Sequence, residues 1–146
     1  MTTSPLEPPR ILHVGGCLCA RVRFAAQTDP VASGYCHCRI CQRSSGAPVL
    51  AWGSFPIDSF AYVEGSPRVY PSSDHGQREF CAHCGTQLVY RESRNAQVVD
   101  VNLASLDRPG AVEPRCHLFT RDRIAWFETA DAYPRFEAGA PERPPA

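Results

Sequence analysis

The sequence contains no lysine, so all 15 of its basic residues are arginines, and 15 acidic residues balance them to a net charge of zero. A domain that binds nucleic acid usually carries an excess of positive charge gathered on one face. The arginines here are scattered along the chain, so we expect no nucleic acid among its partners. The sequence also lacks a run of about 18 apolar residues, the length that a membrane-spanning helix needs, so we expect no membrane partner.

Residues 1–10 have neither the basic start nor the apolar stretch of a secretory signal peptide, which favours a cytoplasmic location. This expectation bears on the eight cysteines of the chain, because a reducing cytosol disfavours disulfides and leaves thiols able to bind metal. The cysteines also stand in Cys-x-Cys and Cys-x-x-Cys pairs, a spacing that suits zinc better than a disulfide framework. We therefore expect zinc sites, and disulfides are the alternative.

A chain of 146 residues is long enough to form one domain that buries about 68–70% of its unfolded surface. Both ends are rich in proline, so we expect unstructured tails at 1–12 and 138–146 around a single zinc domain at 13–137. We find no long segment with the 3.6-residue period of an amphipathic helix. Short strands separated by turns roughly every 8–12 residues instead predict a mainly β fold.

Strands are expected where apolar and polar residues alternate. One expected strand contains Cys17 and Cys19 and continues to Phe24, and its period of two would turn both thiols to the same side. A tight knuckle or short helix is expected to begin at Cys38 and to end near Gly46. Further strands are expected at 49–52, 60–63, 68–70, 87–91, 97–103, 116–119 and 123–127.

Seven of the cysteines fall into groups that suggest two different zinc sites. Cys36, Cys38 and Cys41 supply three thiols, and zinc with three protein ligands usually keeps its fourth position open for water or substrate. Cys17, Cys19, Cys81 and Cys84 supply four thiols, enough to close a structural site. This is the simplest pairing, and a site that combines Cys17 and Cys19 with Cys38 and Cys41 is the alternative.

Three motifs carry a resemblance to a known family: Gly16–Phe24, Cys36–Arg43 with Gly46 and Ala47, and Phe80–Thr86. Together they closely resemble the glutathione-dependent formaldehyde-activating enzyme family, which also takes in centromere protein V. The resemblance implies an Mss4-like fold of short antiparallel strands with zinc knuckles and little helix. It also implies that the four-thiol group holds a structural zinc and that the three-thiol group holds a second, labile zinc near the substrate.

The family's named reaction joins formaldehyde to glutathione. The resemblance therefore implies a zinc-dependent carbon–sulfur lyase or synthase in which Cys36, Cys38 and Cys41 are the catalytic cysteines. A thiol bound at the open zinc position would be deprotonated and ready to attack an aldehyde carbon. Glutathione carries two carboxylates, which arginine matches as a bidentate donor, so Arg39 and Arg43 are the candidate residues for binding it.

For the remaining candidate residues, a structural role is the favoured interpretation. We expect His37 and His83 to point away from the metal, and Cys116 to be a small buried residue. His117 is expected to pack or to bond the backbone. The aromatic residues are expected mostly in the core, with a pocket-lining role for one of them as the alternative; they are Trp52, Phe55, Trp126 and Phe127.

Two other functions compete with the enzyme. One is a zinc-stabilised module that binds a protein partner and has no catalytic activity. The other is methionine-sulfoxide reduction with Cys116 as nucleophile, which the sequence disfavours because Cys17-x-Cys19 and the three-cysteine motif depart from the usual two Cys-x-x-Cys pairs.

Overall fold

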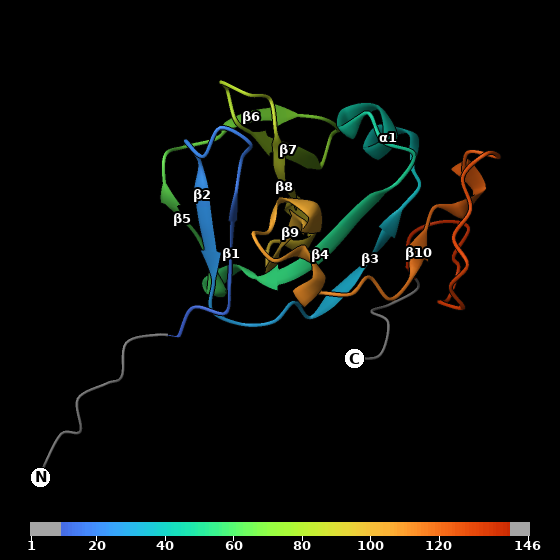
Figure 1. The fold of residues 1–146 in the computed structure, drawn as a ribbon. Helices are drawn as coiled ribbons and strands as arrows, with labels where there is room; N and C mark the ends of the chain where they lie inside the picture. The colour runs from blue at the N-terminus through green and yellow to red at the C-terminus, as the bar shows by residue number, and fades with distance from the viewer. Residues whose placement is uncertain (1–9, 141–146) are drawn as a thin grey trace, which may run out of the picture.

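The computed structural model of the chain describes residues 10–140, so residues 1–9 and 141–146 of the expected tails lie outside the described residues. Two sheets make up most of it (Figure 1). The smaller is antiparallel, in the order β1 (His13–Gly16), β2 (Arg23–Ala26) and β5 (Phe60–Glu64). The expected mainly β fold of short antiparallel strands is confirmed.

The larger sheet has seven strands. Their order is β10 (His117–Leu118), β3 (Ala32–Cys36), β4 (Leu50–Pro56), β9 (Val98–Asn102), β8 (Gln87–Glu92), β7 (Gly76–Phe80) and β6 (Arg68–Pro71). Every pairing is antiparallel except that of β10 with β3. The edge strand β10 lies beside β3 at one side of the molecule (Figure 1).

One α-helix is present in residues 10–140, α1 (Arg39–Ser45), with Cys38 as its N-cap and Gly46 as its left-handed C-cap. Its expected start and end are therefore confirmed. The same described residues also contain five short 3-10 helices: η1 (Ile57–Ser59), η2 (Ser93–Asn95), η3 (Leu103–Ser105), η4 (Pro109–Ala111) and η5 (Thr120–Asp122).

Two of the predicted strands are wrong. The first was to run unbroken through Cys17 and Cys19, but β1 ends at Gly16 and pairs with β2, so the chain must reverse between them. Ala20 adopts a left-handed φ of 63° in this turn, and the Cys17 amide donates to the Val22 carbonyl at 3.0 Å. The two thiols are therefore brought together by a turn and not by strand alternation.

The second error concerns the C-terminal pair of strands. Only His117 and Leu118 pair, and they pair with β3, because the chain bends at Phe119, whose φ is 55°. Residues 123–127 form a turn in which the Phe127 amide donates to the Ile124 carbonyl at 3.0 Å.

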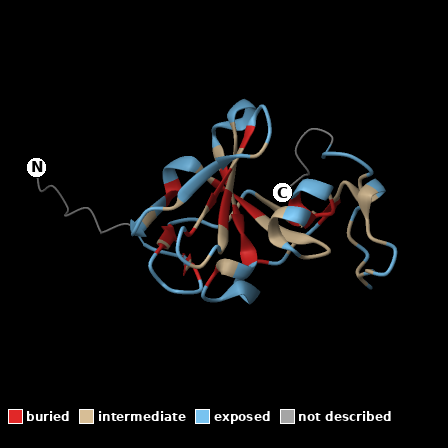
Figure 2. Ribbon diagram, turned by 90° about the horizontal axis from the view of Figure 1, so that it is seen from above, coloured by how far each residue is buried: buried red, intermediate tan, exposed pale blue. Residues whose placement is uncertain are grey.

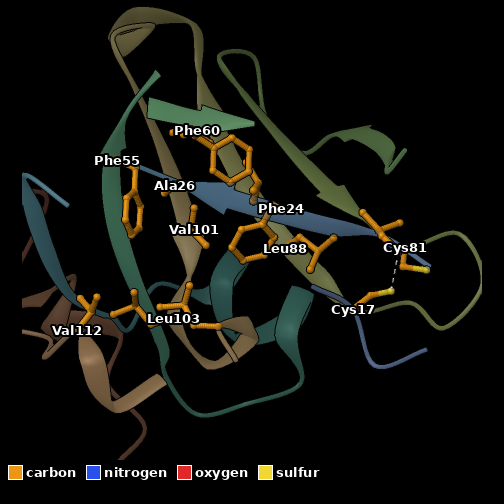
Figure 3. Close-up of a cluster of buried hydrophobic side chains, with 14 residues drawn as sticks. Cys17, Phe24, Ala26, Phe55, Phe60, Cys81, Leu88, Val101, Leu103 and Val112 are labelled. Carbon is orange, nitrogen blue, oxygen red and sulfur yellow. Dashed lines mark hydrogen bonds between the residues drawn. The ribbon is translucent and has the colours of Figure 1, made fainter. Parts of the chain in front are cut away.

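The hydrophobic core lies between the two sheets, and it is the buried centre of the molecule in Figure 2. Phe24 and Phe60 from the small sheet meet Phe55 and Val101 from the large one (Figure 3), and Val99 belongs to the same cluster. Residues in alternate positions of a strand point to opposite faces, so the neighbours of these core residues point to the other face of the large sheet. That second face carries Ser54, Asp100, Tyr90 and Arg78 as partners across successive strands.

Gly65 holds the β5–β6 connection against the turn that carries Cys17 and Cys19. Its φ is +66°, and a Cβ added there would lie 2.0 Å from the Arg21 carbonyl oxygen. We predict that Gly65→Ala lowers the free energy of unfolding by roughly 2–4 kcal/mol. Alanine is strained at a left-handed φ, and its Cβ would also overlap the Arg21 carbonyl oxygen.

Urea unfolding with zinc present would measure this loss. Gly110→Ala is the matched control, since a Cβ at Gly110 meets nothing within 4 Å. Equal stability of the two variants would contradict the prediction.

Candidate functional site

The structure brings four cysteines together at the end of the core: Cys17, Cys19, Cys81 and Cys84 have ligand atoms within 4.8 Å of one another. The first two come from the β1–β2 turn and the others from the turn after β7. Cys17 and Cys81 are also members of the hydrophobic cluster and lie near each other in Figure 3. Gly85, at a φ of +76°, closes the second turn by donating its amide to the Cys81 carbonyl at 2.9 Å.

The sulfur distances fit a tetrahedral zinc ion. The Sγ atoms of Cys17 and Cys19 are 3.6 Å apart, and those of Cys19 and Cys81 are 3.7 Å apart. Four sulfurs about 2.3 Å from one zinc are separated from each other by about 3.8 Å. All eight cysteines are free, so these are thiols and not disulfides. A hydrogen bond with Thr86 Oγ1 lowers the pKa of Cys84 to about 5, which favours the thiolate that a metal needs.

The second cluster consists of Cys36, Cys38 and Cys41, whose sulfurs also lie within 4.8 Å of one another. Cys36 ends β3, Cys38 caps α1 and Cys41 follows one turn later. The Cys41 amide donates to the Cys38 sulfur at 3.3 Å, which fixes the side chain of the cap. The alternative grouping of Cys17 and Cys19 with Cys38 and Cys41 does not occur.

The three thiols of this cluster differ in the direction in which their pKa values are shifted. Hydrogen bonds with Cys36 and then Cys41 lower the pKa of Cys38 to about 2, and the Arg78 guanidinium acts in the same direction. The pKa of Cys36 is raised in turn, chiefly by its hydrogen bond with Cys38. A bound cation would favour the thiolate form of all three cysteines.

The three-cysteine cluster opens into a cavity of about 800 Å³ between the large sheet, α1 and the C-terminal segment. The floor is the polar face of the sheet, with Ser54, Asp100, Tyr90 and Arg78 in one row across four strands. Burial raises the pKa of Asp100, against the hydrogen bond that its carboxylate accepts from Ser54. Charged, aromatic and apolar side chains thus surround one space beside three thiols.

The structure separates the two arginines that were expected to bind substrate. Arg39 lines the cavity and contacts Gln42 Oε1. Arg43 is exposed and is not among the described residues that line it. Three further arginines at the cavity, Arg78, Arg94 and Arg121, were not predicted, because they approach it from segments that are distant in the sequence.

His37 belongs to a buried chain of hydrogen bonds that the sequence did not reveal. Its Nε2 lies 2.8 Å from His117 Nδ1, and His117 Nε2 lies 3.0 Å from Asp131 Oδ1. Because the carboxylate only accepts, His117 donates from Nε2, and a neutral His117 ring then accepts at Nδ1 from His37 Nε2. Burial lowers the pKa of His37, in agreement with a neutral ring.

This chain of bonds ties the C-terminal segment to the three-cysteine cluster. Gln42 adds to it by donating from Nε2 to the His37 carbonyl at 2.7 Å and to the Asp122 carbonyl at 3.1 Å. Both histidines were considered from the sequence, His37 as a residue that points away from the metal and His117 as one that packs or bonds the backbone. The aspartate that completes the chain stands 14 positions away, at a spacing that no motif marks.

Other expected residues lie as follows. Cys116 is 2% exposed and Phe55 is fully buried, as predicted, and Trp52 lines the cavity. The prediction that Trp126 belongs to the core is wrong, since it is 76% exposed on the C-terminal turn. Neither His37 nor His83 belongs to a cysteine cluster in residues 10–140, and the His83 ring contacts Arg21 instead.

The sequence profile of one protein family, described as "Glutathione-dependent formaldehyde-activating enzyme", matches residues 12–122. The chain belongs to this family, as the cysteine motifs indicated. The match covers both cysteine clusters and ends at Asp122, before the segment that contributes Asp131.

Two curated relatives are similar over parts of the chain. An uncharacterized lyase of Schizosaccharomyces pombe is 30% identical over 78 residues, 53% of this chain and 56% of the relative, so the chain spans little more than half of that protein. A putative glutathione-dependent formaldehyde-activating enzyme of Halomonas elongata is 25% identical over 127 residues, 81% of each chain. A crystal structure of a Rhodobacter sphaeroides protein shares the fold, with a TM-score of 0.56 and 21% identity over 70% of this chain and 92% of that one.

None of the helices in residues 10–140 is both long enough and apolar enough to cross a membrane.

We predict that Asp131→Ala destabilises the protein by about 1.5–3 kcal/mol, because it leaves the buried His117 Nε2 without its charged acceptor. Thermal unfolding at pH 7 with zinc present would detect the loss. Asp74→Ala is the control, since Asp74 is exposed and makes no side-chain hydrogen bond in the described part of the chain. A melting temperature equal to that of the control would show that the hydrogen-bonded chain contributes nothing.

Proposed function

We propose that the chain is a zinc-dependent carbon–sulfur lyase or synthase that joins a glutathione-like thiol to a small aldehyde such as formaldehyde. The observation that carries this proposal is the three-thiol cluster in the wall of a cavity of about 800 Å³. Membership of the formaldehyde-activating family and the names of the two relatives support the same class of reaction.

In this proposal the four-cysteine cluster holds a structural zinc and the three-cysteine cluster holds a second, labile zinc. The first set closes around its metal with ligands from two segments 62 residues apart. The second set comes from one short segment, and its three thiols leave one tetrahedral position for a ligand from the cavity. When bound there, zinc would lower the pKa of an incoming thiol and keep it as the nucleophilic thiolate.

The residues of the cavity supply the binding of the organic part of the substrate. Arg39 and Arg121 line it, and neither forms an ion pair with a carboxylate in residues 10–140. Their guanidinium groups match the two carboxylates of a glutathione-like thiol. Arg43, which is exposed away from the cavity lining, is a weaker candidate than Arg121.

The competing function, a zinc-stabilised module that binds a protein partner, needs the structural zinc alone. It leaves the cavity and the second cluster without a role. A concave space with a few convergent polar groups is typical of small-molecule sites, so it supports the enzyme.

The two clusters should respond in opposite ways to substitution. We predict that Cys84→Ser prevents stable folding, because structural zinc binding is itself part of the folding free energy. Cys38→Ser should keep the fold and lower the zinc content by about one equivalent. Circular dichroism and a metal count would measure both effects, with Cys116→Ser as the control, since Cys116 lies in neither cluster. A folded Cys84→Ser protein, or an unfolded Cys38→Ser protein, would reverse the assignment.

The reaction itself can be tested by exchange NMR with ¹³C-formaldehyde and glutathione at equilibrium with their adduct. We predict that the zinc-loaded protein accelerates exchange between the free aldehyde and the adduct, and that Cys38→Ser abolishes the acceleration. Zinc ions at the same concentration without protein are the control for free metal. An exchange rate unchanged by the zinc-loaded protein would reject this substrate pair.

A further inference from the structure

Arg78 is a buried arginine beside the three-cysteine cluster that no sequence motif indicated. It is 6% exposed, stands on β7, and lines the cavity. Its Nη2 donates to the Cys41 sulfur at 3.5 Å, and its guanidinium lies over the Tyr90 ring at 5.0 Å from the centroid. Its Nε is buried without a hydrogen-bond partner in residues 10–140. Such a placement is costly for a side chain that always carries a positive charge.

The charge of Arg78 has no carboxylate partner. The other arginines of the described chain that are two thirds or more buried are Arg23, Arg91 and Arg123, and each forms an ion pair, with Asp107, Glu79 and Glu128 respectively. Arg78 forms none in the described part of the chain. The contact with Tyr90 is a cation–π interaction, which offsets only a small part of the penalty for burying an ion. The group that the Arg78 guanidinium does contact is the Cys41 sulfur, so the cysteine cluster is the candidate source of the counter-charge.

The three sulfurs can supply the negative charge that would balance the positive charge of Arg78. Three thiolates around one Zn²⁺ carry a net charge of −1, and one guanidinium makes the whole assembly neutral. A thiolate from the cavity would bring a further negative charge to the same place. Without a fixed positive group that arrival is opposed, since like charges repel strongly where water is excluded.

We propose that Arg78 is the positioning counter-ion of the three-cysteine cluster, through which that cluster gains its affinity for metal and for an anionic thiol. The inference rests on the proposed function, because it takes the three-cysteine cluster to be the metal site that receives the thiol. It adds a residue outside the cysteine motifs that sets how strongly the site holds its ligands. Its hydrogen bond to Cys41 also holds that sulfur in place, as outer groups around metal ligands commonly do.

Two substitutions of Arg78 separate charge from packing. Arg78→Met keeps the length of the apolar stem against Tyr90 and removes the charge, whereas Arg78→Lys keeps the charge and loses the planar guanidinium. Zinc affinity would be measured on the full chain by competition with a chelator that has a colorimetric readout. We expect Arg78→Met to weaken the second equivalent of zinc about 10–100-fold, the range typical of outer-sphere groups, and to leave the first unchanged. Arg78→Lys should retain most of the affinity.

The matched control is Arg91→Gln. Arg91 stands on the adjacent strand β8, and its partner Glu79 lies on the core face of β7. This variant removes one positive charge and destabilises the fold without touching the three-cysteine cluster, so it should bind both equivalents of zinc as the wild type does. A loss in Arg91→Gln as large as that in Arg78→Met would overturn the proposal, because it would trace the effect to stability alone.

The absorption spectrum of the cobalt(II)-substituted protein provides a second measurement, which a change in side-chain packing alone would not alter. The thiolate-to-cobalt charge-transfer band of the second site should shift to longer wavelength in Arg78→Met, because a sulfur that has lost its hydrogen-bond donor is a better electron donor. Wild-type affinity and an unshifted band in Arg78→Met would overturn the inference and leave the proposed function intact. A wild-type chain that binds only one equivalent of metal would instead overturn the proposed function.

Discussion

The alternation of side chains across the seven-stranded sheet is the constraint on which the candidate site depends. Successive residues of β9 serve opposite faces: Val99 and Val101 enter the core, and Asp100 between them faces the cavity. On β7, Glu79 turns toward Tyr62 on the core side, and Arg78 faces the thiols. A register slip of one residue would place charges in the core and valines in the cavity. The sheet thus builds a hydrophobic core and a polar cavity from the same strands.

The two sulfur clusters differ in how the fold supports them. The four-cysteine cluster sits where two tight turns meet at the edge of the core, and its buried members pack among apolar side chains. The unfolded chain would lose conformational entropy if its distant cysteines were held together by one metal ion. A metal therefore binds such a cluster well only in the folded chain, and its binding free energy adds to the free energy of folding. The three-cysteine cluster is local, within one strand end and one short helix, and it faces open space. A metal held by cysteines from one short segment, with one side open to the cavity, is better suited to exchanging a bound small molecule than to stabilising the fold.

Distant segments supply the surroundings of the local cluster. Arg78 reaches Cys41 from 37 positions away, and Asp131 reaches His37 through His117 from the far end of the chain. The family match stops at Asp122, so the last part of this hydrogen-bonded chain lies outside the residues that define the family. The cysteine motif alone therefore specifies the sulfurs, and the tertiary fold specifies their charge balance and their orientation.

The sequence by itself determined the mainly β class, the short helix from its cap at Cys38 to Gly46, and the two groups of cysteines. These are local features, and they follow from turn residues, period-two alternation and close ligand spacing. Only the tertiary structure decided four other features. These are the turn at Cys17–Val22, the parallel pairing of β10, the exposure of Trp126, and the approach of Arg78 and Asp131. Each of them depends on which distant strand or loop lies alongside, and that choice arises from burying the whole apolar surface at once, which no local pattern encodes.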